Sequence, residues 1–313
     1  MKVIIQIPCL NEEATLPLVF EKMPKKIKGV DILEYLIVDD GSTDKTVEVA
    51  KKLGVHHIVR HPKNMGLARS FHDGVSYALS IGADIVVNTD GDNQYPQESI
   101  PDLLQPILDG KADIVIGDRQ TSTIAHFSPL KKLLQRFGSY IVNKAAGTDI
   151  PDAASGFRAY SRASLMRLNI ITSFSYCMET IIQAGNKRLA ITSIPITTNA
   201  KTRESRLFKS MGQHVMKSGA AITRAYLMYK PHVIFSTLGL LLLVIGLIPF
   251  VRFLYLTMSG SEGSHIQSLI AGATLLTGAF LSFVLGIVAD IIRTNRILTE
   301  ESLEHIKHIR FDK

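Results

Sequence analysis

Residues 88–94 (NTDGDNQ) place two carboxylates and a side-chain amide at alternating positions, directly after the apolar stretch at residues 84–87. Because alternate residues of an extended backbone point the same way, Asp90, or Asp92 together with Gln94, could direct oxygens at one divalent cation. Mg²⁺ and Mn²⁺ prefer oxygen ligands and are commonly shared between carboxylates and substrate phosphates. Such a cation could neutralise a departing diphosphate, although the same residue types also build ordinary turns.

Three further polar segments follow strand-like stretches and open helix-like ones: residues 8–13 (PCLNEE), 39–46 (DDGSTDKT) and 64–69 (NMGLAR). Ser42 or Thr43 could cap the helix that follows, and this role is compatible with a second one in a site. Asp39 and Asp40 end an apolar strand, where adjacent acids face a ligand crevice. Arg69 stands near a helix N-terminus that suits an anion. Four such strand ends indicate one site better than four unrelated turns.

The elements that must position these residues alternate along residues 1–200. Strand-like stretches cover residues 3–8, 35–39, 57–60, 85–90, 114–117 and 191–196. Helix-like stretches cover residues 12–23, 43–53, 67–80, 98–108, 129–146 and 176–184. The strands are short, β-branched and continuously apolar, which is typical of a mostly parallel sheet covered on both faces. We therefore predict an open α/β domain that binds ligands beyond the carboxyl ends of its strands.

Two apolar segments follow, at residues 233–258 and 266–292, and each is long enough to cross a bilayer. The short linker at residues 259–265 carries no Lys or Arg, whereas basic residues flank the pair on its other side. We therefore predict a transmembrane hairpin within residues 232–292 whose two ends face the cytoplasm, with residues 293–313 as a cytosolic tail. The alternative is a buried hairpin in a soluble core.

The segment before the first span, residues 201–231, is rich in Lys and Arg and contains Glu204 as its one acid. Its apolar residues recur at helical spacing, which predicts a basic amphipathic helix on the membrane surface. An ordinary solvated helix face is the alternative. The location of these charges accounts for the net charge of +7 without a nucleic-acid partner.

The 313 residues are 46% hydrophobic, which is enough for a substantial core. Cys9 and Cys177 lie far apart in apolar surroundings, so we expect both to be core residues. The apolar stretch at residues 3–8 is too short for a signal peptide, so we expect the N-terminal region to stay cytoplasmic. His56, His57 and His61 lack helical metal spacing, which favours a surface or strand-edge role.

The motifs together resemble family 2 nucleotide-sugar glycosyltransferases with a GT-A fold, and within them the dolichyl-phosphate mannose synthase and bacterial polyprenyl-phosphate glycosyltransferase branch. The resemblance runs from residue 3 to near residue 210. The matching stretches are residues 8–12, 39–44, 64–67, 90–94, 117–119 (GDR) and 152–158 (DAASGFR). It implies a membrane enzyme that uses Mg²⁺ or Mn²⁺.

The resemblance also implies roles for individual residues. Nucleotide binding would fall to Pro8, Asn11, Glu12, Asp39, Asp40, Asp90 and Gly91. The metal would be held by Asp92 and Gln94, with Asp90 near the ribose or the metal. The catalytic residues would be Asp92, Arg119, Ser155 and Arg158. The acceptor phosphate would meet a basic loop containing Arg203, Arg206 and Lys209, although its spacing departs from the Arg-x-x-x-Ser-Lys form of the mannose synthases.

Two sequence features narrow the expected reaction. The chain contains no tryptophan and hence no Gln-x-x-Arg-Trp stretch, which disfavours a processive polysaccharide synthase. Ala153 and Ala154 stand where members that use a hydroxyl acceptor would offer an acidic base. A lipid monophosphate is already anionic, so it needs positive groups such as Arg119 and Arg158 rather than a base.

We therefore expect an inverting transfer of one hexose-type sugar from a UDP- or GDP-linked donor to polyprenyl or dolichyl phosphate, at the cytoplasmic face of a prokaryotic cell membrane rather than the endoplasmic reticulum. Membrane lipids are the other expected partner, and the sequence also allows a homo-oligomer. One alternative is a membrane glycosyltransferase with a hydroxyl acceptor, such as a lipid-linked sugar. Another is a non-catalytic scaffold that retains the fold, which the intact acids of residues 90–94 disfavour.

Overall fold

The computed structural model describes residues 1–121, 129–170, 176–200, 219–220, 223, 227–260 and 266–312. The chain divides into two compact units. The first comprises Met1–Ala225 together with Glu301–Lys313, and the second comprises Tyr226–Glu300.

Within the described residues, the first unit is built on a seven-stranded sheet of order β3-β2-β1-β4-β6-β5-β7. The strands are β1 (Lys2–Cys9), β2 (Ile32–Asp39), β3 (His57–Arg60), β4 (Ile85–Asn88), β5 (Ile114–Asp118), β6 (Arg158–Ser161) and β7 (Ile191–Pro195). Strand β6 runs antiparallel to both of its neighbours, whereas the other pairs are parallel. The predicted mostly parallel sheet is confirmed.

Strand β6 was not among the predicted strands. It is four residues long and begins with a charged residue, so neither its length nor its pattern identifies it. Its antiparallel direction places Arg158 opposite Asn88 of β4 and opposite Ile116 of β5. The segment that precedes β6 therefore lies at the sheet edge where β4 and β5 end.

The helices of this unit are α1 (Leu16–Glu21), α2 (Thr46–Lys52), α3 (Leu67–Ser80), α4 (Ile100–Leu108), α5 (Pro129–Ala146), α6 (Arg162–Arg167) and α7 (Tyr176–Asn186), with a 3₁₀ turn at Gln97–Ser99. Helices α3 and α5 begin and end at the predicted residues. Helix α1 is shorter than predicted, because Glu12 enters a turn in which the hydroxyl of Thr15 binds its carboxylate.

The sheet is covered on both faces, as its apolar strands predicted. On one face, Val3, Ile5 and Ile7 of β1 pack in a core with Leu16 of α1 and Leu103 of α4. On the other face, Phe71 of α3 stacks on Tyr176 of α7 at a centroid distance of 4.0 Å and lies 5.5 Å from Tyr160 of β6. Cys9 and Cys177 are both buried free thiols, as expected.

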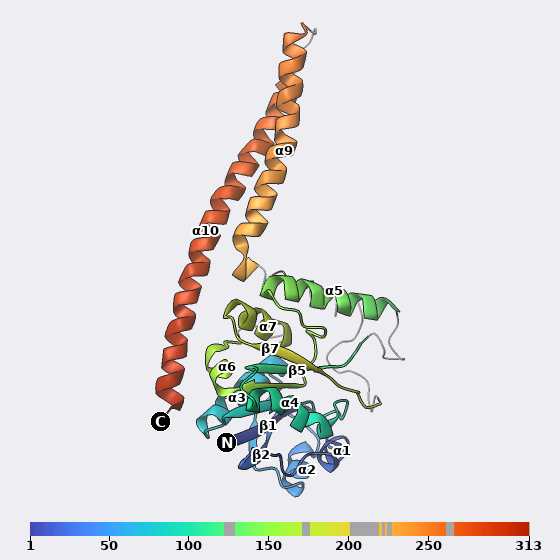
Figure 1. The fold of residues 1–313 in the computed structure, drawn as a ribbon. Coiled ribbons are helices and arrows are strands. Elements are labelled where there is room, and N and C mark those ends of the chain that lie inside the picture. The colour runs from blue at the N-terminus through green and yellow to red at the C-terminus, as the bar shows by residue number, and fades with distance from the viewer. Residues whose placement is uncertain are drawn as a thin grey trace. The chain divides into compact units, whose positions relative to one another are not determined.

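Among the described residues, two helices are long and apolar enough to cross a membrane: α9 (Pro231–Met258) and α10 (Ile266–Phe311). They run side by side (Figure 1), and glycines allow close contact, with Gly239 against Phe283 and Gly272 against Phe250. Their outward side chains are exposed; Leu241, for example, is 52% exposed. This exposure disfavours the alternative of a buried hairpin in a soluble core.

Helix α10 continues well beyond the predicted span. Its final turns belong to the first unit, where Lys307 donates to the carbonyl of Leu168 at 2.6 Å and Arg162 donates to Asp312 at 3.0 Å. The predicted tail at residues 293–313 is therefore largely helical, and its end is bound within the first unit. The predicted amphipathic helix at residues 201–231 lies mostly outside the described residues and stays a prediction.

Candidate active site

The polar motifs gather at one edge of the sheet. Strands β1, β2, β3, β4 and β5 run in the same direction, so all five end at this edge. The segment that precedes the antiparallel strand β6 lies there too. The strand order also reverses between β1 and β4, because the chain continues from β1 to β2 on one side and reaches β4 on the other. Open α/β sheets bind ligands in the crevice at such a switch point.

The loops after β1 and β2 are joined through Asn11. Its side-chain oxygen accepts from the backbone N–H of Thr43 at 2.8 Å, and its own N–H donates to the hydroxyl of Ser42 at 2.9 Å. Asn11 has a φ of 55°, a left-handed conformation that is uncommon outside glycine. Residues held in this region cluster at functional sites, and here the conformation turns the chain toward the second loop.

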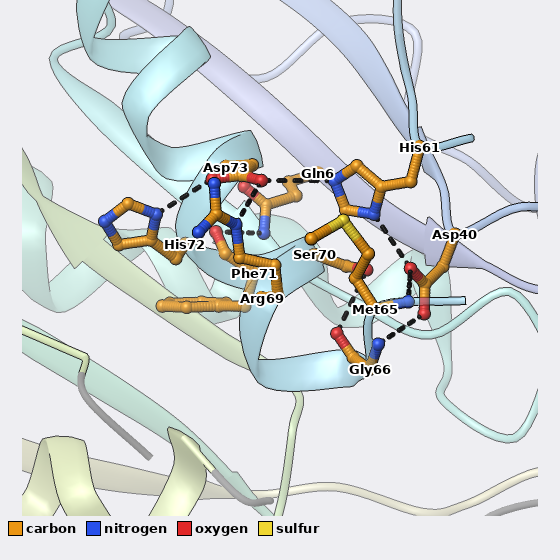
Figure 2. A network of polar contacts seen from close by, with 10 residues as sticks. All are labelled: Gln6, Asp40, His61, Met65, Gly66, Arg69, Ser70, Phe71, His72 and Asp73. Atoms are coloured by element: carbon orange, nitrogen blue, oxygen red, sulfur yellow. Dashed lines mark hydrogen bonds and ion pairs between the residues drawn. The ribbon is translucent and has the colours of Figure 1, made fainter. Parts of the chain in front are cut away.

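The loops after β2 and β3 are joined through Asp40. Its carboxylate accepts from the N–H groups of Met65 and Gly66 at 2.8 and 2.9 Å, and it lies 2.8 Å from Nδ1 of His61 (Figure 2). The neighbouring Asp39 is fully buried and accepts from the N–H of Ser42. Both acids are buried, and they hold the loops of this edge in place.

His61 is the residue whose role the sequence pattern misjudged. It is only 6% exposed, so it is not a surface histidine. Its two ring nitrogens lie between two carboxylates, 2.8 Å from Asp40 and 3.2 Å from Asp73 of α3 (Figure 2). Asp73 in turn accepts from Nε of Arg69 at 2.6 Å. His61 therefore connects the end of β2 to helix α3, a link that spacing in the sequence does not reveal.

The loops after β1 and β4 meet at the switch point. The hydroxyl of Thr15 lies 2.7 Å from the carbonyl of Gly91 and 2.7 Å from a carboxylate oxygen of Glu12. A Cβ on Gly91 would stand 3.0 Å from the sulfur of Cys9, so a larger residue would push the loops apart. Pro8 is buried within β1, behind these loops. The predicted nucleotide-binding residues thus come from loops that touch one another.

Residues 90–94 follow β4 at this edge. Asp90, Asp92 and Gln94 are all partly exposed. Asn93 adopts a φ of 59°, and the N–H of Gln94 donates to Asp92 at 3.1 Å. The carboxylate of Asp90 faces Gly156, since a Cβ on that glycine would lie 3.6 Å from both of its oxygens. The segments at residues 90–94 and 152–158 are therefore neighbours in space.

The donor set at residues 90–94 fits a hard divalent cation that is shared with a ligand. Among the residues that the structure describes, no three His, Cys, Asp or Glu side chains gather as a metal site. Two partly exposed carboxylates and an amide are too few for a closed protein cage, but Mg²⁺ commonly takes one or two carboxylates and completes its shell with phosphates and water. The fit is therefore to a cation that arrives with a diphosphate.

Arg119 and Asp152 form a buried ion pair. Nε and Nη2 of Arg119 donate to the two carboxylate oxygens at 2.6 and 2.9 Å, a bidentate geometry. Burial alone would raise the pKa of Asp152, but the charge and hydrogen bonds of Arg119 outweigh it and the pKa of Asp152 is lowered. The side chain of Arg119 keeps 17% of its surface exposed, so it can also face a ligand.

Arg158 is placed differently from the expectation that it contacts the acceptor phosphate. It is fully buried, and its guanidinium donates to the carbonyls of Ala153, Ser155 and Cys177 and to the hydroxyl of Thr180, at 2.7–2.9 Å. Because its guanidinium is occupied by these acceptors, Arg158 fixes the conformation of the loop before β6. We therefore revise its role from a phosphate contact to a positioning residue.

Several residues of this edge were missed from the sequence. Asn88 donates to the carbonyl of Gly156 at 3.0 Å and to the hydroxyl of Tyr176, and the hydroxyl of Tyr95 accepts from the N–H of Gly156 at 2.9 Å. Asn199, after β7, donates to the carbonyl of Gln94 at 2.9 Å. The position of the polar Asn88 at the end of an apolar strand could have identified it as a site residue, whereas nothing in the sequence around Asn199 indicates its role. The predicted acceptor-binding residues Arg203, Arg206 and Lys209 lie outside the described residues.

Comparison with known families identifies the class of protein. The model for "Glycosyl transferase family 2" matches residues 4–168, which include every strand described above except β7 and the start of β1. The chain therefore belongs to glycosyl transferase family 2. The family and its GT-A fold are those that the sequence motifs predicted.

Among its relatives, the low-salt glycan biosynthesis hexosyltransferase Agl6 of Haloferax volcanii is 29% identical over 294 residues, which cover 90% of this chain and 67% of the relative. The UDP-N-acetylglucosamine–dolichyl-phosphate N-acetylglucosaminyltransferase of Methanococcus voltae is 28% identical, covering 61% of this chain and 83% of the relative. The dolichol-phosphate mannosyltransferase of Pyrococcus furiosus is 32% identical, covering 66% of this chain and 59% of the relative. The names of the second and third relatives are those of the predicted branch.

Solved structures share the fold. Glucosyl-3-phosphoglycerate synthase from Mycobacterium tuberculosis, in complex with Mn²⁺, UDP-glucose and phosphoglyceric acid, superposes with a TM-score of 0.55 at 23% identity. The match covers 71% of this chain and 79% of the synthase. At this identity the likeness establishes the fold, which confirms the predicted architecture.

Proposed function

We propose that this protein transfers one sugar from a nucleotide-sugar donor to a polyprenyl or dolichyl phosphate, with inversion at the anomeric carbon. The observation that carries the proposal is the contact between the loops after β1 and β4 at the switch point, beside the partly exposed Asp90 and Asp92. In a family 2 glycosyltransferase with two apolar helices, this arrangement suits a charged donor and a lipid acceptor.

The donor would bind across the loops after β1, β2 and β4. Asn11, Glu12 and Asp40 border the nucleoside side, with Asp39 and Pro8 supporting them from behind. Asp90, Asp92 and Gln94 would hold Mg²⁺ or Mn²⁺, which when bound offsets the charge of the nucleoside diphosphate leaving group. Gly91 keeps the loop close to Glu12, and Arg119 offers a partly exposed positive charge.

The acceptor side favours a lipid monophosphate. The acid of the segment before β6, Asp152, is bound to both arms of Arg119 and is buried, so it is not placed to remove a proton from a hydroxyl. A phosphate needs no such base. Ser155 has a buried hydroxyl without a hydrogen-bond partner among the described residues, which suits a contact with a ligand. We assign Arg203, Arg206 and Lys209 to the acceptor phosphate on the sequence resemblance.

The names of the relatives support this choice, since those from Methanococcus voltae and Pyrococcus furiosus name dolichyl or dolichol phosphate as acceptor. We place the catalytic unit on the cytoplasmic face of a prokaryotic cell membrane, with α9 and α10 as the two spans, on the distribution of basic residues around them. The base of the donor, uridine or guanosine, is left to experiment.

The test uses the full chain in lipid nanodiscs with labelled UDP- and GDP-linked sugars and either Mg²⁺ or Mn²⁺. Polyprenyl phosphate and the matching unphosphorylated polyprenol are offered in parallel. We expect labelled lipid only with the phosphate, and a product whose anomeric configuration is opposite to that of the donor. Transfer to lipid-linked sugars or polyprenol instead would establish the hydroxyl-acceptor alternative, and donor binding without any transfer would point to a scaffold.

A further inference from the structure

Asn199 follows strand β7 at the edge of the sheet that carries the candidate site. Strand β7 runs parallel to β5, and the two strands end together, with Pro195 opposite Asp118. The next residue, Ile196, is buried, and its N–H donates to the carbonyl of Asp118 at 2.8 Å. This contact brings the chain that leaves β7 to the edge where residues 90–94 lie, and Asn199 follows three residues later.

Asn199 holds three consecutive carbonyl groups of the neighbouring loop. Its backbone N–H donates to the carbonyl of Gln94 at 2.9 Å. Its side-chain amide donates to the carbonyls of Asn93 and Tyr95, at 3.0 and 3.3 Å. An asparagine amide has two donor hydrogens, so these two contacts use its whole donor capacity. Asn199 is therefore committed to the backbone of residues 93–95.

The loop that Asn199 holds has an uncommon backbone conformation. Asn93 adopts a φ of 59°, which a residue other than glycine keeps only where surrounding contacts fix it. Within the loop, the N–H of Gln94 donates to the carboxylate of Asp92 at 3.1 Å, and this contact orients that carboxylate. The conformation at Asn93 thus sets the directions of the flanking Asp92 and Gln94. Asn199 holds that conformation from a distant part of the chain.

The end of the loop has a support of its own. The side chain of Gln97 is fully buried and donates to the carbonyl of Tyr95 at 3.1 Å and to the hydroxyl of Thr89 at 3.0 Å. Gln97 therefore closes the loop at its base, whereas Asn199 also binds its middle. Loss of the Asn199 side chain should leave the loop attached to the domain while it frees the residues between the two ends.

We propose that Asn199 is a positioning residue for the cation, which acts by holding the loop that carries Asp92 and Gln94. The carbonyls of residues 93–95 are directed at Asn199, so side chains, and not these carbonyls, supply the protein's oxygens to the cation. Removing a group that orients metal ligands typically lowers metal affinity by about 10–100-fold. The inference rests on the assignment of Mg²⁺ or Mn²⁺ to residues 90–94 in the proposed function.

Binding of Mn²⁺ tests this role without turnover. The full chain in zwitterionic nanodiscs is titrated with Mn²⁺ in the presence of UDP or GDP and without acceptor, and free Mn²⁺ is measured by electron paramagnetic resonance. We expect Asn199→Ala to weaken Mn²⁺ binding by about ten-fold. Asn199→Gln keeps both donors on a longer side chain and should recover part of the loss. Asp92→Ala reports whether the cation binds at residues 90–94.

Asn186→Ala is the matched control. The amide of Asn186 also donates to two backbone carbonyls, those of Ile182 and Ala145, but it does so within helices α7 and α5. Asn186→Ala and Asn199→Ala should lower the thermal unfolding midpoint by similar small amounts. Only Asn199→Ala should weaken the binding of Mn²⁺, which separates positioning of the cation from a general loss of stability.

Turnover gives a second readout. Asn199→Ala should raise the Mn²⁺ concentration at half-maximal turnover, whereas kcat at saturating Mn²⁺ should return close to that of the parent. If Asn199→Ala does not fold, Asn199→Ser, which keeps one donor, is measured in its place. Unchanged Mn²⁺ binding in the Asn199 variants, with binding lost in Asp92→Ala, would overturn the role of Asn199 and leave the metal assignment standing. Mn²⁺ binding that Asp92→Ala does not alter would remove the metal assignment, and the role of Asn199 with it.

Discussion

Two charged segments lie next to each other at the edge of the sheet, and they use their charges in opposite ways. In residues 90–94 the carboxylates of Asp90 and Asp92 stay partly exposed. In residues 152–158 the charges of Asp152 and Arg158 are buried and bound to protein groups. Both segments have the composition of an active-site motif, yet only the first leaves its charged atoms within reach of a ligand.

A charged motif can therefore contribute to a site by holding its loops in place and not by contacting the ligand. Arg158 and Asp152 hold the loop that faces Asp90, and removing either would distort the site without removing a group that touches substrate. Substitutions in the two segments should therefore separate: those at residues 152–158 should change stability, and those at residues 90–94 should change activity. Five predictions test that separation, from the largest expected effect to the smallest.

Asp152→Ala leaves the largely buried Arg119 without its partner. Breaking a buried ion pair in this way costs about 3–5 kcal/mol, so the thermal unfolding midpoint of the detergent-solubilised protein should fall sharply. Asp31→Ala is the control, since the side chain of Asp31 is 81% exposed and its loss should change the midpoint little. A midpoint unchanged by Asp152→Ala would mean that the segment is not held by this pair.

The same pair predicts a pH dependence. Arg119 lowers the pKa of Asp152 in the folded protein, so the carboxylate contributes stability above its unfolded pKa. That contribution is lost as the pH falls below about 4, through the lowered folded value. Chemical unfolding between pH 7 and pH 3 should therefore show a steeper acid loss for the parent than for Asp152→Asn.

Asp92→Ala should affect activity and spare stability. Removing a charge-stabilising group at a reacting centre typically costs about 10²–10³ in kcat. A partly exposed side chain of this kind should change the free energy of unfolding by no more than about 0.5 kcal/mol. Glu48→Ala, an exposed acid on α2, is the control. Full turnover in Asp92→Ala would remove this residue from the metal assignment.

His61→Ala tests a buried side chain that we expect to affect both stability and substrate binding. The substitution removes a hydrogen bond to the charged Asp40, and a bond of this kind contributes about 1.5–3 kcal/mol. The loops on the nucleoside side of the site should therefore be held less firmly. We expect the KM for the nucleotide sugar to rise more than kcat falls, and His61→Gln to restore part of the loss. A lower unfolding midpoint with an unchanged KM would assign His61 to folding alone.

Tyr95→Phe should have the smallest effect, and it tests directly whether residues 90–94 and 152–158 depend on each other. Tyr95 directly follows residues 90–94, and its hydroxyl accepts from Gly156 in the other segment. Losing one such hydrogen bond costs about 0.5–1.5 kcal/mol. Both the unfolding midpoint and the turnover should fall slightly, because this bond connects the two segments. A change in only one of them would show that the segments act independently.

The sequence predicted the elements whose patterns are long and regular. Helices α3 and α5 were bounded correctly because their apolar residues recur over three turns or more. Strand β6 escaped, since four residues beginning with a buried arginine carry no recognisable period. The two spans were visible from length alone, but the attachment of the end of α10 to the catalytic unit through Lys307 and Arg162 was not.

What the sequence determined by itself was the kind of chemistry: acids, amides and glycines after apolar strands, followed by two membrane-length helices, in the order of one enzyme family. What only the tertiary structure decided was which charged atoms remain available. Asp92 and Arg158 are equally polar in sequence, but the first stays partly exposed while the second is enclosed among backbone carbonyls. A charged side chain can act on a ligand only where the folded protein leaves it accessible, and that depends on contacts between residues far apart in the chain.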